Sequence, residues 1–249
     1  MTSKEKAENW LNQDIDDSTR LEIKALLAGN SGLLEDSFYK DLEFGTGGMR
    51  GIMGVGSNRV NSYTLGMATQ GLANYLQKCF VNKHTKVAIA YDCRDNSDTF
   101  ARLVADVLTG NGIEVLLFQD LRPTPQLSFA VRHYNCQSGI VITASHNPPE
   151  YNGYKVYWED GAQIVAPHDK GIISEVAAIK NFAEVKFQGN PKLLTLLGQE
   201  TDEKFIHASL EQRKSEIKNP LKIVFTSLHG TSITLMPELL KRAGYEDVH

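Results

Sequence analysis

A buried apolar run and a polar turn meet in Gly139-Ile140-Val141-Ile142-Thr143-Ala144-Ser145-His146-Asn147-Pro148. The uncharged start of this run is rich in β-branched residues, which predicts a strand over residues 139–143. A serine and a histidine follow that strand directly. Lys155 comes shortly afterwards, in a segment that resembles the next strand. The pattern therefore predicts reactive side chains at the end of a buried strand.

The flanking sequence alternates between strand and helix patterns. Apolar runs at residues 86–91 and 114–118 predict two more strands. Helical spacing of apolar residues predicts helices over residues 63–80, around 100–108 and over 126–134. This alternation predicts an α/β fold, a layered helix–sheet–helix domain with a mixed or parallel sheet. Reactive loops of such sheets lie beyond the carboxyl ends of the strands.

Three regions are expected along the chain. Residues 1–40 have the pattern of a helical extension, residues 41–190 that of the first α/β domain, and residues 200–249 that of the incomplete start of a second, similar one. Between the two domains, residues 183–200 show no strong periodicity, as expected of a boundary. The second domain is expected to contain a helix over 202–217, a strand over 221–226, a helix over 235–242 and the approach to another strand over 245–249.

The composition excludes several classes of protein. The 26 Lys and Arg against 30 Asp and Glu give a net charge of −4, whereas a nucleic-acid binder would show a basic face. No apolar run approaches the roughly 20 residues needed to cross a bilayer, and the charged start lacks the apolar core of a secretion signal. Three dispersed cysteines, Cys79, Cys93 and Cys136, fit reduced thiols. The sequence therefore predicts a cytoplasmic protein without nucleic-acid or membrane partners; oligomeric state is left open.

The serine segment has the groups that phosphoryl transfer requires. A serine hydroxyl is a poor nucleophile until a base or nearby cations assist it. Phosphoryl transfer itself depends mainly on positioning and positive charge. Ser145, His146 and Lys155 could supply both. The simpler alternative is that Ser145 and Asn147 only cap a turn before Pro148.

A second motif is the glycine-dense stretch Phe44-Gly45-Thr46-Gly47-Gly48-Met49-Arg50-Gly51-Ile52-Met53-Gly54-Val55-Gly56. So many glycines predict a loop rather than a strand. Its backbone N–H groups could approach an anion, and Arg50 could bind phosphate or sugar oxygens. A flexible hinge is the alternative. The stretch matches neither a nucleotide P-loop nor a dinucleotide fingerprint.

Residues 143–155 resemble the active-serine loop of the α-D-phosphohexomutases, the superfamily of phosphoglucomutase and phosphomannomutase, with the usual form T-A-S-H-N-P-x-x-x-N-G-x-K. The resemblance implies that Ser145 is a phosphoserine in the resting enzyme. It also implies that His146 supports the phosphate, that Asn147 contributes to binding it and that Lys155 assists proton transfer. Members hold Mg²⁺ against this phosphate, which would make Ser145 a metal ligand.

Other segments extend the resemblance. The glycine-dense stretch is similar to the family element F-G-T-x-G-x-R-G, which implies that Thr46 and Arg50 bind phosphate or substrate. The Asp92–Ser97 segment is similar to D-x-R-x-S, and Arg94 is expected to support the serine loop structurally. Further similarities lie at Arg122-Pro123-Thr124-Pro125-Gln126, Gly161-Ala162-Gln163-Ile164 and Leu228-His229-Gly230-Thr231.

The resemblance implies an isomerase of carbohydrate metabolism, which moves a phosphoryl group between the 1- and 6-positions of a hexose phosphate. Hexose 1,6-bisphosphate would be the intermediate and activator, and Mg²⁺ the cofactor. A phosphopentomutase and a non-catalytic module remain alternatives. The family metal loop D-G-D-x-D-R does not occur in the 249 residues; the acidic Asp14-Ile15-Asp16-Asp17 lacks its glycine and arginine and is expected to cap a helix. Because members have four domains, the chain is expected to be an N-terminal part that is inactive alone.

Overall fold

The fold is built on one mixed six-stranded sheet with the order β1-β5-β4-β2-β3-β6. The computed structural model describes residues 1–29, 31–45, 47–214 and 221–249. The strands are β1 Gly48–Ile52, β2 Lys86–Tyr91, β3 Glu114–Phe118, β4 Ser138–Ile142, β5 Tyr151–Trp158 and β6 Leu194–Leu197. β4, β2, β3 and β6 are parallel neighbours, whereas β5 is antiparallel to both β4 and β1. The predicted α/β fold with a mixed sheet is confirmed.

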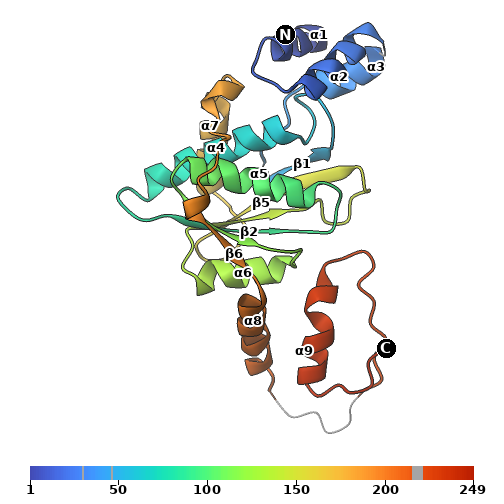
Figure 1. Cartoon of the computed structure of the whole chain (residues 1–249), viewed down its shortest axis with the longest axis vertical. Helices are drawn as coiled ribbons and strands as arrows, with labels where there is room; N and C mark the ends of the chain where they lie inside the picture. Colours follow the sequence, from blue (N-terminus) through green and yellow to red (C-terminus); the bar gives the residue numbers. More distant parts are fainter. Residues whose placement is uncertain (30, 46, 215–220) are drawn as a thin grey trace.

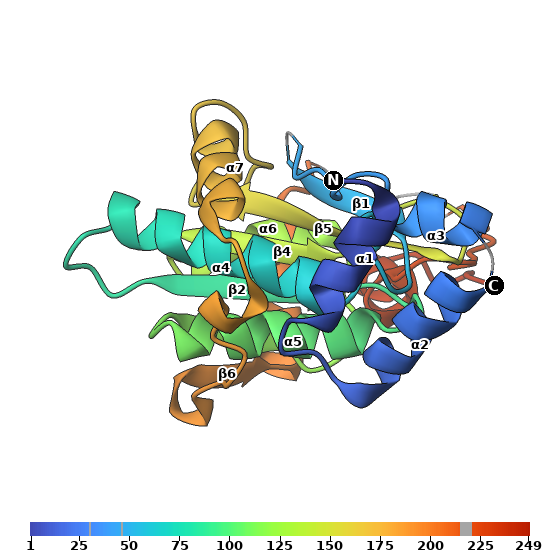
Figure 2. The ribbon, with the colours of Figure 1, turned by 90° about the horizontal axis from the view of Figure 1, so that it is seen from above.

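Helices cover both faces of this sheet (Figures 1 and 2). The helices after β1 are α4 Ser62–Cys79, α5 Ser97–Gly110, α6 Thr124–His133, α7 His168–Ala178, which packs on α4, and α8 Gln199–Glu211, which packs on α6. α4 and α5 pack on one face together with Ile140 and Ile142, and α6 packs on the other together with Val141. Successive side chains of a strand point to opposite faces of the sheet. The face on which any other residue of these strands lies can therefore be counted from Ile140, Val141 and Ile142.

Three helices precede the sheet, α1 Ser3–Leu11, α2 Asp17–Ala28 and α3 Ser31–Phe38, all within residues 1–40, where a helical pattern is predicted (Figure 1). Their small core centres on Trp10, whose ring lies edge-on to Phe38 at 5.6 Å and to Phe182 at 4.9 Å. Asp16 caps α2 by accepting a hydrogen bond from the Thr19 amide at 2.9 Å, as predicted for the acidic cluster. No helix of the described residues is long and apolar enough to cross a membrane.

The glycine-dense stretch differs from its prediction as a loop, because part of it forms β1. This strand pairs with β5, and Gly48 lies opposite Lys155 while Arg50 lies opposite Gly153. The glycines are required by close packing: a Cβ at Gly153 would come within 2.7 Å of the Thr143 carbonyl oxygen, and one at Gly48 would collide with the backbone of β5. Glycine inside a strand marks such a close approach of backbones.

The boundary predicted over residues 183–200 also contains structure. Two 3₁₀ turns, η1 Phe182–Glu184 and η2 Pro191–Leu193, lead into β6, which pairs with β3 through Val115 and Leu194. The sheet therefore continues beyond residue 190. β6 is a short edge strand without a clear alternation, which is why the pattern does not reveal it. The division into two domains stays a prediction.

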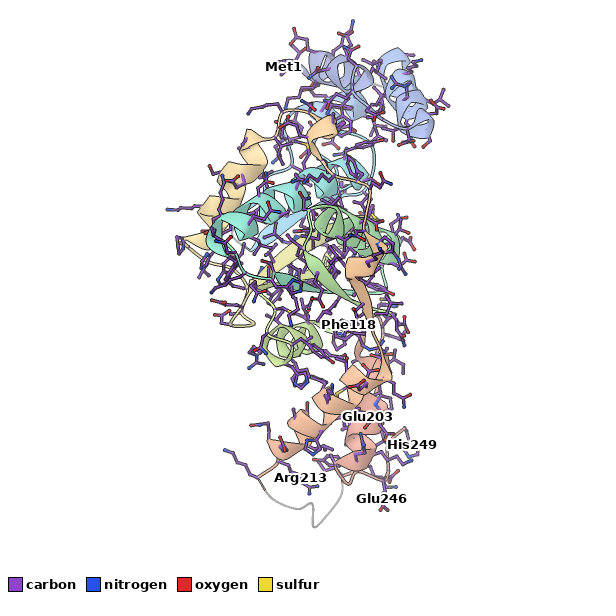
Figure 3. All side chains as sticks on the ribbon, turned by 60° about the vertical axis from the view of Figure 1, so that its left-hand side comes forward. Met1, Phe118, Glu203, Arg213, Glu246 and His249 are labelled. Atoms are coloured by element: carbon purple, nitrogen blue, oxygen red, sulfur yellow. The ribbon has the colours of Figure 1, made fainter. Side chains whose placement is uncertain are left out.

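Beyond β6 the described elements are α8, the 3₁₀ turn η3 Ser232–Thr234 and α9 Met236–Arg242. α9 agrees with its prediction, whereas α8 is shorter than the predicted helix over 202–217, whose last residues lie outside the described part. The strand predicted over 221–226 forms only a parallel bridge between Ile223 and Val248. Arg242 of α9 binds Glu203 of α8 at 2.7 Å; Figure 3 labels Glu203 on α8 below Phe118 of the sheet.

An ion pair between the buried Arg122 and the partly buried Asp202 joins α8 to the segment before α6. Arg122 donates from Nε and Nη2 to the two carboxylate oxygens of Asp202, both at 2.8 Å, and Gln126 adds a donor at 2.7 Å. Burial acts to raise the pKa of Asp202, but the hydrogen bonds from Arg122 and Gln126 outweigh it, so this pKa lies below its ordinary value. The carboxylate is therefore bound as an ion between α6 and α8.

We expect Asp202→Asn to lower the free energy of unfolding by about 2 kcal/mol at pH 7, because the buried Arg122 would lose its hydrogen-bonded carboxylate and keep the more distant one of Asp120, at 3.9 Å. A depressed pKa stabilises the fold above the ordinary value of 3.8, and this contribution is lost as the pH falls through the lower pKa of the folded state. Urea unfolding should therefore show the difference from wild type shrinking in strong acid. Glu203→Gln, which breaks an exposed pair, should cost less than about 1 kcal/mol; equal losses in both variants would contradict this account.

Candidate functional site

Ser145 lies directly beyond the carboxyl end of β4, in a loop that presents its side chain to solvent. Its backbone has φ +58°, in the left-handed region that residues other than glycine seldom adopt. The Ser145 amide donates to Thr143 Oγ1 at 2.9 Å, and Ser145 Oγ lies 3.4 Å from His146 Nδ1. The serine hydroxyl is thus exposed, beside an imidazole, on a backbone held in one conformation.

Arg94 lies under this loop and binds its backbone. One terminal nitrogen donates to the carbonyl oxygens of Pro148 at 2.8 Å and Tyr151 at 3.0 Å. The other donates to those of Ser145 at 2.9 Å and Asn147 at 2.7 Å. Its side chain is only 11% exposed. The guanidinium group therefore gathers four carbonyl groups of this turn; the Pro148 carbonyl also accepts from the Tyr151 amide at 3.1 Å.

Asp92 connects the loop after β2 with the loop after β4. Its Oδ2 accepts from Thr143 Oγ1 at 2.6 Å, and its Oδ1 accepts from Ser97 Oγ at 2.8 Å and from the Arg94 amide at 3.1 Å. Neither Asp92 nor Thr143 was among the predicted site residues. Their positions in the sequence could have identified them, because Asp92 directly follows β2 and Thr143 directly follows β4. These two strands pair in parallel, so both residues lie at the same edge of the sheet.

Two cations lie on the sheet face that leads to the serine loop. Lys155 pairs with Val141, which belongs to the α6 side of the sheet, and the alternation of β5 places Lys155 on that side. Arg50 lies there too, since it is opposite Gly153 across β1, and a Cβ on Gly153 would be 3.4 Å from Arg50 Cβ. Within the described residues, neither cation has a hydrogen-bond or ion-pair partner. Both charges are therefore available to an anion.

The other two predicted binding residues are Asn147 and Thr46. Asn147 lies in the serine loop with its side-chain Oδ1 buried and without a hydrogen-bond partner among the described residues. Thr46 lies outside the described residues. The roles predicted for Ser145 and the other site residues in catalysis and binding stay predictions.

A small cavity of about 130 Å³ opens beside Ser145. One wall comes from the loops of the sheet and the other from the segment after α8; the lining consists of Asp92, Arg122, Thr124, Val141, Thr143, Ser145, His229, Gly230 and Thr231. The His229 carbonyl accepts from Cys93 Sγ at 3.4 Å, which joins the two walls. The volume is several times the roughly 30 Å³ of one water molecule, so a small anion fits.

The described residues do not form a metal site by themselves. No group of three or more His, Cys, Asp or Glu side chains in this part of the chain is arranged to hold an ion. A Mg²⁺ ion usually takes six oxygen ligands, of which a phosphate on Ser145 would be one. A complete magnesium site would therefore need oxygen ligands beyond those that the described residues bring together.

Residues 41–183 match the family model of phosphoglucomutase/phosphomannomutase, alpha/beta/alpha domain I. The chain belongs to this family. It is 40% identical over 227 residues to a phosphoglucomutase of Staphylococcus haemolyticus, covering 86% of this chain and 39% of that protein. It is 46% identical over 171 residues to human phosphopentomutase, covering 66% of this chain and 28% of that protein. The chain thus spans less than half of either relative.

A solved structure supports the same assignment. The putative phosphomannomutase from Thermus thermophilus superimposes with a TM-score of 0.72 at 27% identity, over 84% of this chain and 45% of that one. The match to the family model ends at residue 183 of this chain, whereas the sheet of the chain continues to β6. The serine loop, Arg94 and Lys155 all lie inside the matched region.

We expect Arg94→Ala to loosen the serine loop, because four carbonyl groups would lose the guanidinium donors and the Pro148 carbonyl would keep the Tyr151 amide as its donor. The free energy of unfolding should fall by about 2 kcal/mol, and proteolysis within residues 144–150 should accelerate. Arg94→Lys should restore little of the stability and protease resistance that Arg94→Ala loses, since one ammonium group cannot reproduce the planar guanidinium fork. Arg102→Ala removes an exposed arginine of α5 and serves as the control. An Arg94→Ala protein as stable and as protease-resistant as this control would contradict the role.

Proposed function

We propose that Ser145 carries the phosphoryl group of a phosphosugar mutase, which interconverts a hexose 1-phosphate and a hexose 6-phosphate. The observation that carries the proposal is the exposed hydroxyl of Ser145, held beyond β4 by Arg94 and next to a cavity that fits a small anion. Family membership and the mutase names of the relatives support it.

The proposed reaction begins with phosphorylated Ser145 and a hexose monophosphate. The bond from phosphorus to Ser145 Oγ breaks as a free sugar hydroxyl binds the phosphorus, and the proton of that hydroxyl ends on the serine oxygen. The product is hexose 1,6-bisphosphate. After reorientation, its other phosphoryl group returns to Ser145 by the reverse exchange, which leaves the isomeric monophosphate.

In this proposal the cations of the site stabilise the charge that the transferring group carries. Arg50 and Lys155 lie on the same face of the sheet without protein partners among the described residues, and Lys155 would assist the proton transfer. His146 would support the phosphate from within the loop. Mg²⁺, as the family resemblance implies, would supply Lewis-acid assistance; the phosphate on Ser145 would contribute one ligand.

A phosphopentomutase is the second candidate, because the human relative with that name shares 46% identity over 171 residues. It would move the phosphoryl group between the 1- and 5-positions of a pentose phosphate on the same serine. Comparing the rates at which glucose 1,6-bisphosphate and ribose 1,5-bisphosphate phosphorylate Ser145 distinguishes the two candidates. If neither sugar phosphate reacts, a non-catalytic binding module is favoured.

We expect Ser145→Ala to abolish phosphorylation of the protein by glucose 1,6-bisphosphate. The substitution removes the acceptor oxygen while an exposed loop serine contributes little packing, so the free energy of unfolding should change by less than about 0.5 kcal/mol. Mass spectrometry of tryptic peptides should place one phosphate on Ser145 in the wild type. The matched control is Ser174→Ala, which removes an exposed serine of α7. Phosphate found on another residue would overturn the assignment.

We further expect the 249-residue polypeptide assayed alone to turn over glucose 1-phosphate at least about 1,000-fold more slowly than the phosphoglucomutase of Staphylococcus haemolyticus. The reason is that D-G-D-x-D-R does not occur in it, so positioning and metal assistance would be incomplete. A coupled assay with glucose 1,6-bisphosphate and Mg²⁺ measures this. Turnover close to that of the comparison enzyme would show that these residues contain the whole site.

A further inference from the structure

The conformation of Ser145 depends on a relay of two hydrogen bonds. The Ser145 amide donates to Thr143 Oγ1 at 2.9 Å, and the same hydroxyl donates to Asp92 Oδ2 at 2.6 Å. A hydroxyl group has one proton, and an ionised carboxylate can only accept. The proton of Thr143 is therefore directed to Asp92, which leaves a lone pair of the hydroxyl for the amide. The carboxylate thus orients the acceptor that holds the serine backbone.

This backbone needs such support. A φ of +58° is costly for a residue with a Cβ and persists only when its surroundings enforce it. The Arg94 contacts hold the carbonyl oxygen of Ser145, which constrains one side of the residue. The relay through Thr143 constrains the amide on the other side. Together they fix both peptide groups that flank the serine side chain.

The carboxylate is itself immobilised from several sides. Asp92 Oδ1 accepts from Ser97 Oγ at 2.8 Å, and Ser97 Oγ in turn accepts from Asn152 Nδ2 at 3.0 Å. Ser97 and Asn152 are completely buried. Asn152 belongs to β5, the strand that also carries Lys155. The relay therefore connects the backbone of Ser145 to β5, the strand that carries the cationic Lys155.

We infer that Thr143 and Asp92 are positioning residues, which hold the Ser145 backbone in its left-handed conformation and so aim the serine hydroxyl at the transferring phosphoryl group. The inference rests on the proposed phosphoryl-carrying role of Ser145. Neither residue needs to touch the sugar for this effect. A displacement of about 1 Å at the reacting oxygen can cost roughly 100-fold in rate.

The side chain of Thr143 offers a clean test. Thr143→Val keeps the shape but removes both hydrogen bonds, whereas Thr143→Ser keeps the hydroxyl. Thr69→Val is the matched control, because Thr69 is also buried and its hydroxyl donates to a backbone carbonyl within α4, at 2.7 Å from Leu65 O. The measured quantity is the rate of Ser145 phosphorylation at increasing concentrations of glucose 1,6-bisphosphate.

We expect Thr143→Val to lower the saturating rate about 100-fold and to leave the half-saturating concentration within about twofold, because orientation changes and ground-state binding does not. Thr143→Ser and Thr69→Val should stay within about threefold of wild type. Asp92→Asn should also lower the rate, and the double variant should lose less than the product of the two single losses, because Asp92 acts partly through Thr143 and partly through Arg94, whose Nε lies 3.3 Å from Asp92 Oδ2. Additive losses, or a wild-type rate in Thr143→Val, would overturn the inference.

A second measurement separates this inference from the proposed function. Amide hydrogen exchange at Ser145, followed by NMR in the unphosphorylated chain, reports the Thr143 hydrogen bond directly. It should accelerate roughly tenfold in Thr143→Val and not in Thr69→Val, in line with the loss of one hydrogen bond. Absence of phosphate on wild-type Ser145 would refute the proposed function and the aiming role with it, while unchanged exchange in Thr143→Val would refute the relay itself.

Discussion

The candidate site depends on the hydrogen bonds that the guanidinium group of Arg94 donates to the backbone of the serine loop. Where the chain turns from β4 back into β5, four carbonyl groups converge on this one side chain. Such backbone groups are costly to bury unpaired. The planar fork of arginine satisfies several acceptors at once, and a lysine could not do so. The positively charged Arg94 side chain thus fixes the backbone conformation of the loop around Ser145.

The topology of the sheet makes this arrangement possible. β2 and β4 are parallel neighbours, so the segments that follow them leave the same edge of the sheet side by side. That brings Asp92 and Arg94 under the loop that carries Ser145, although about fifty positions separate the two segments in the chain. β5 then returns antiparallel to β4 and places Lys155 on the face that leads to the serine. The site is assembled by strand order.

The fold could be predicted to a large extent, because it follows from local patterns. The strands β2, β3 and β4 are short apolar runs that are buried on both faces, and the helices α4, α5 and α6 repeat their apolar residues about every 3.6 positions. Local patterns did not predict β1 and β6. The glycines of β1 signal a close approach to β5, which has no local signature, and β6 is a short edge strand whose partner lies far away in the chain.

For the site, the sequence by itself determined the chemical groups: a serine beside a histidine after a strand, a lysine in the next strand, an arginine among glycines, and a motif string that belongs to one family. Only the tertiary structure decided how they are held. The bond from Thr143 to Asp92 and the bonds from Arg94 to the serine loop, which support the left-handed backbone of Ser145, join distant segments of the chain. Local sequence cannot encode these bonds, because each exists only once the parallel strands have paired.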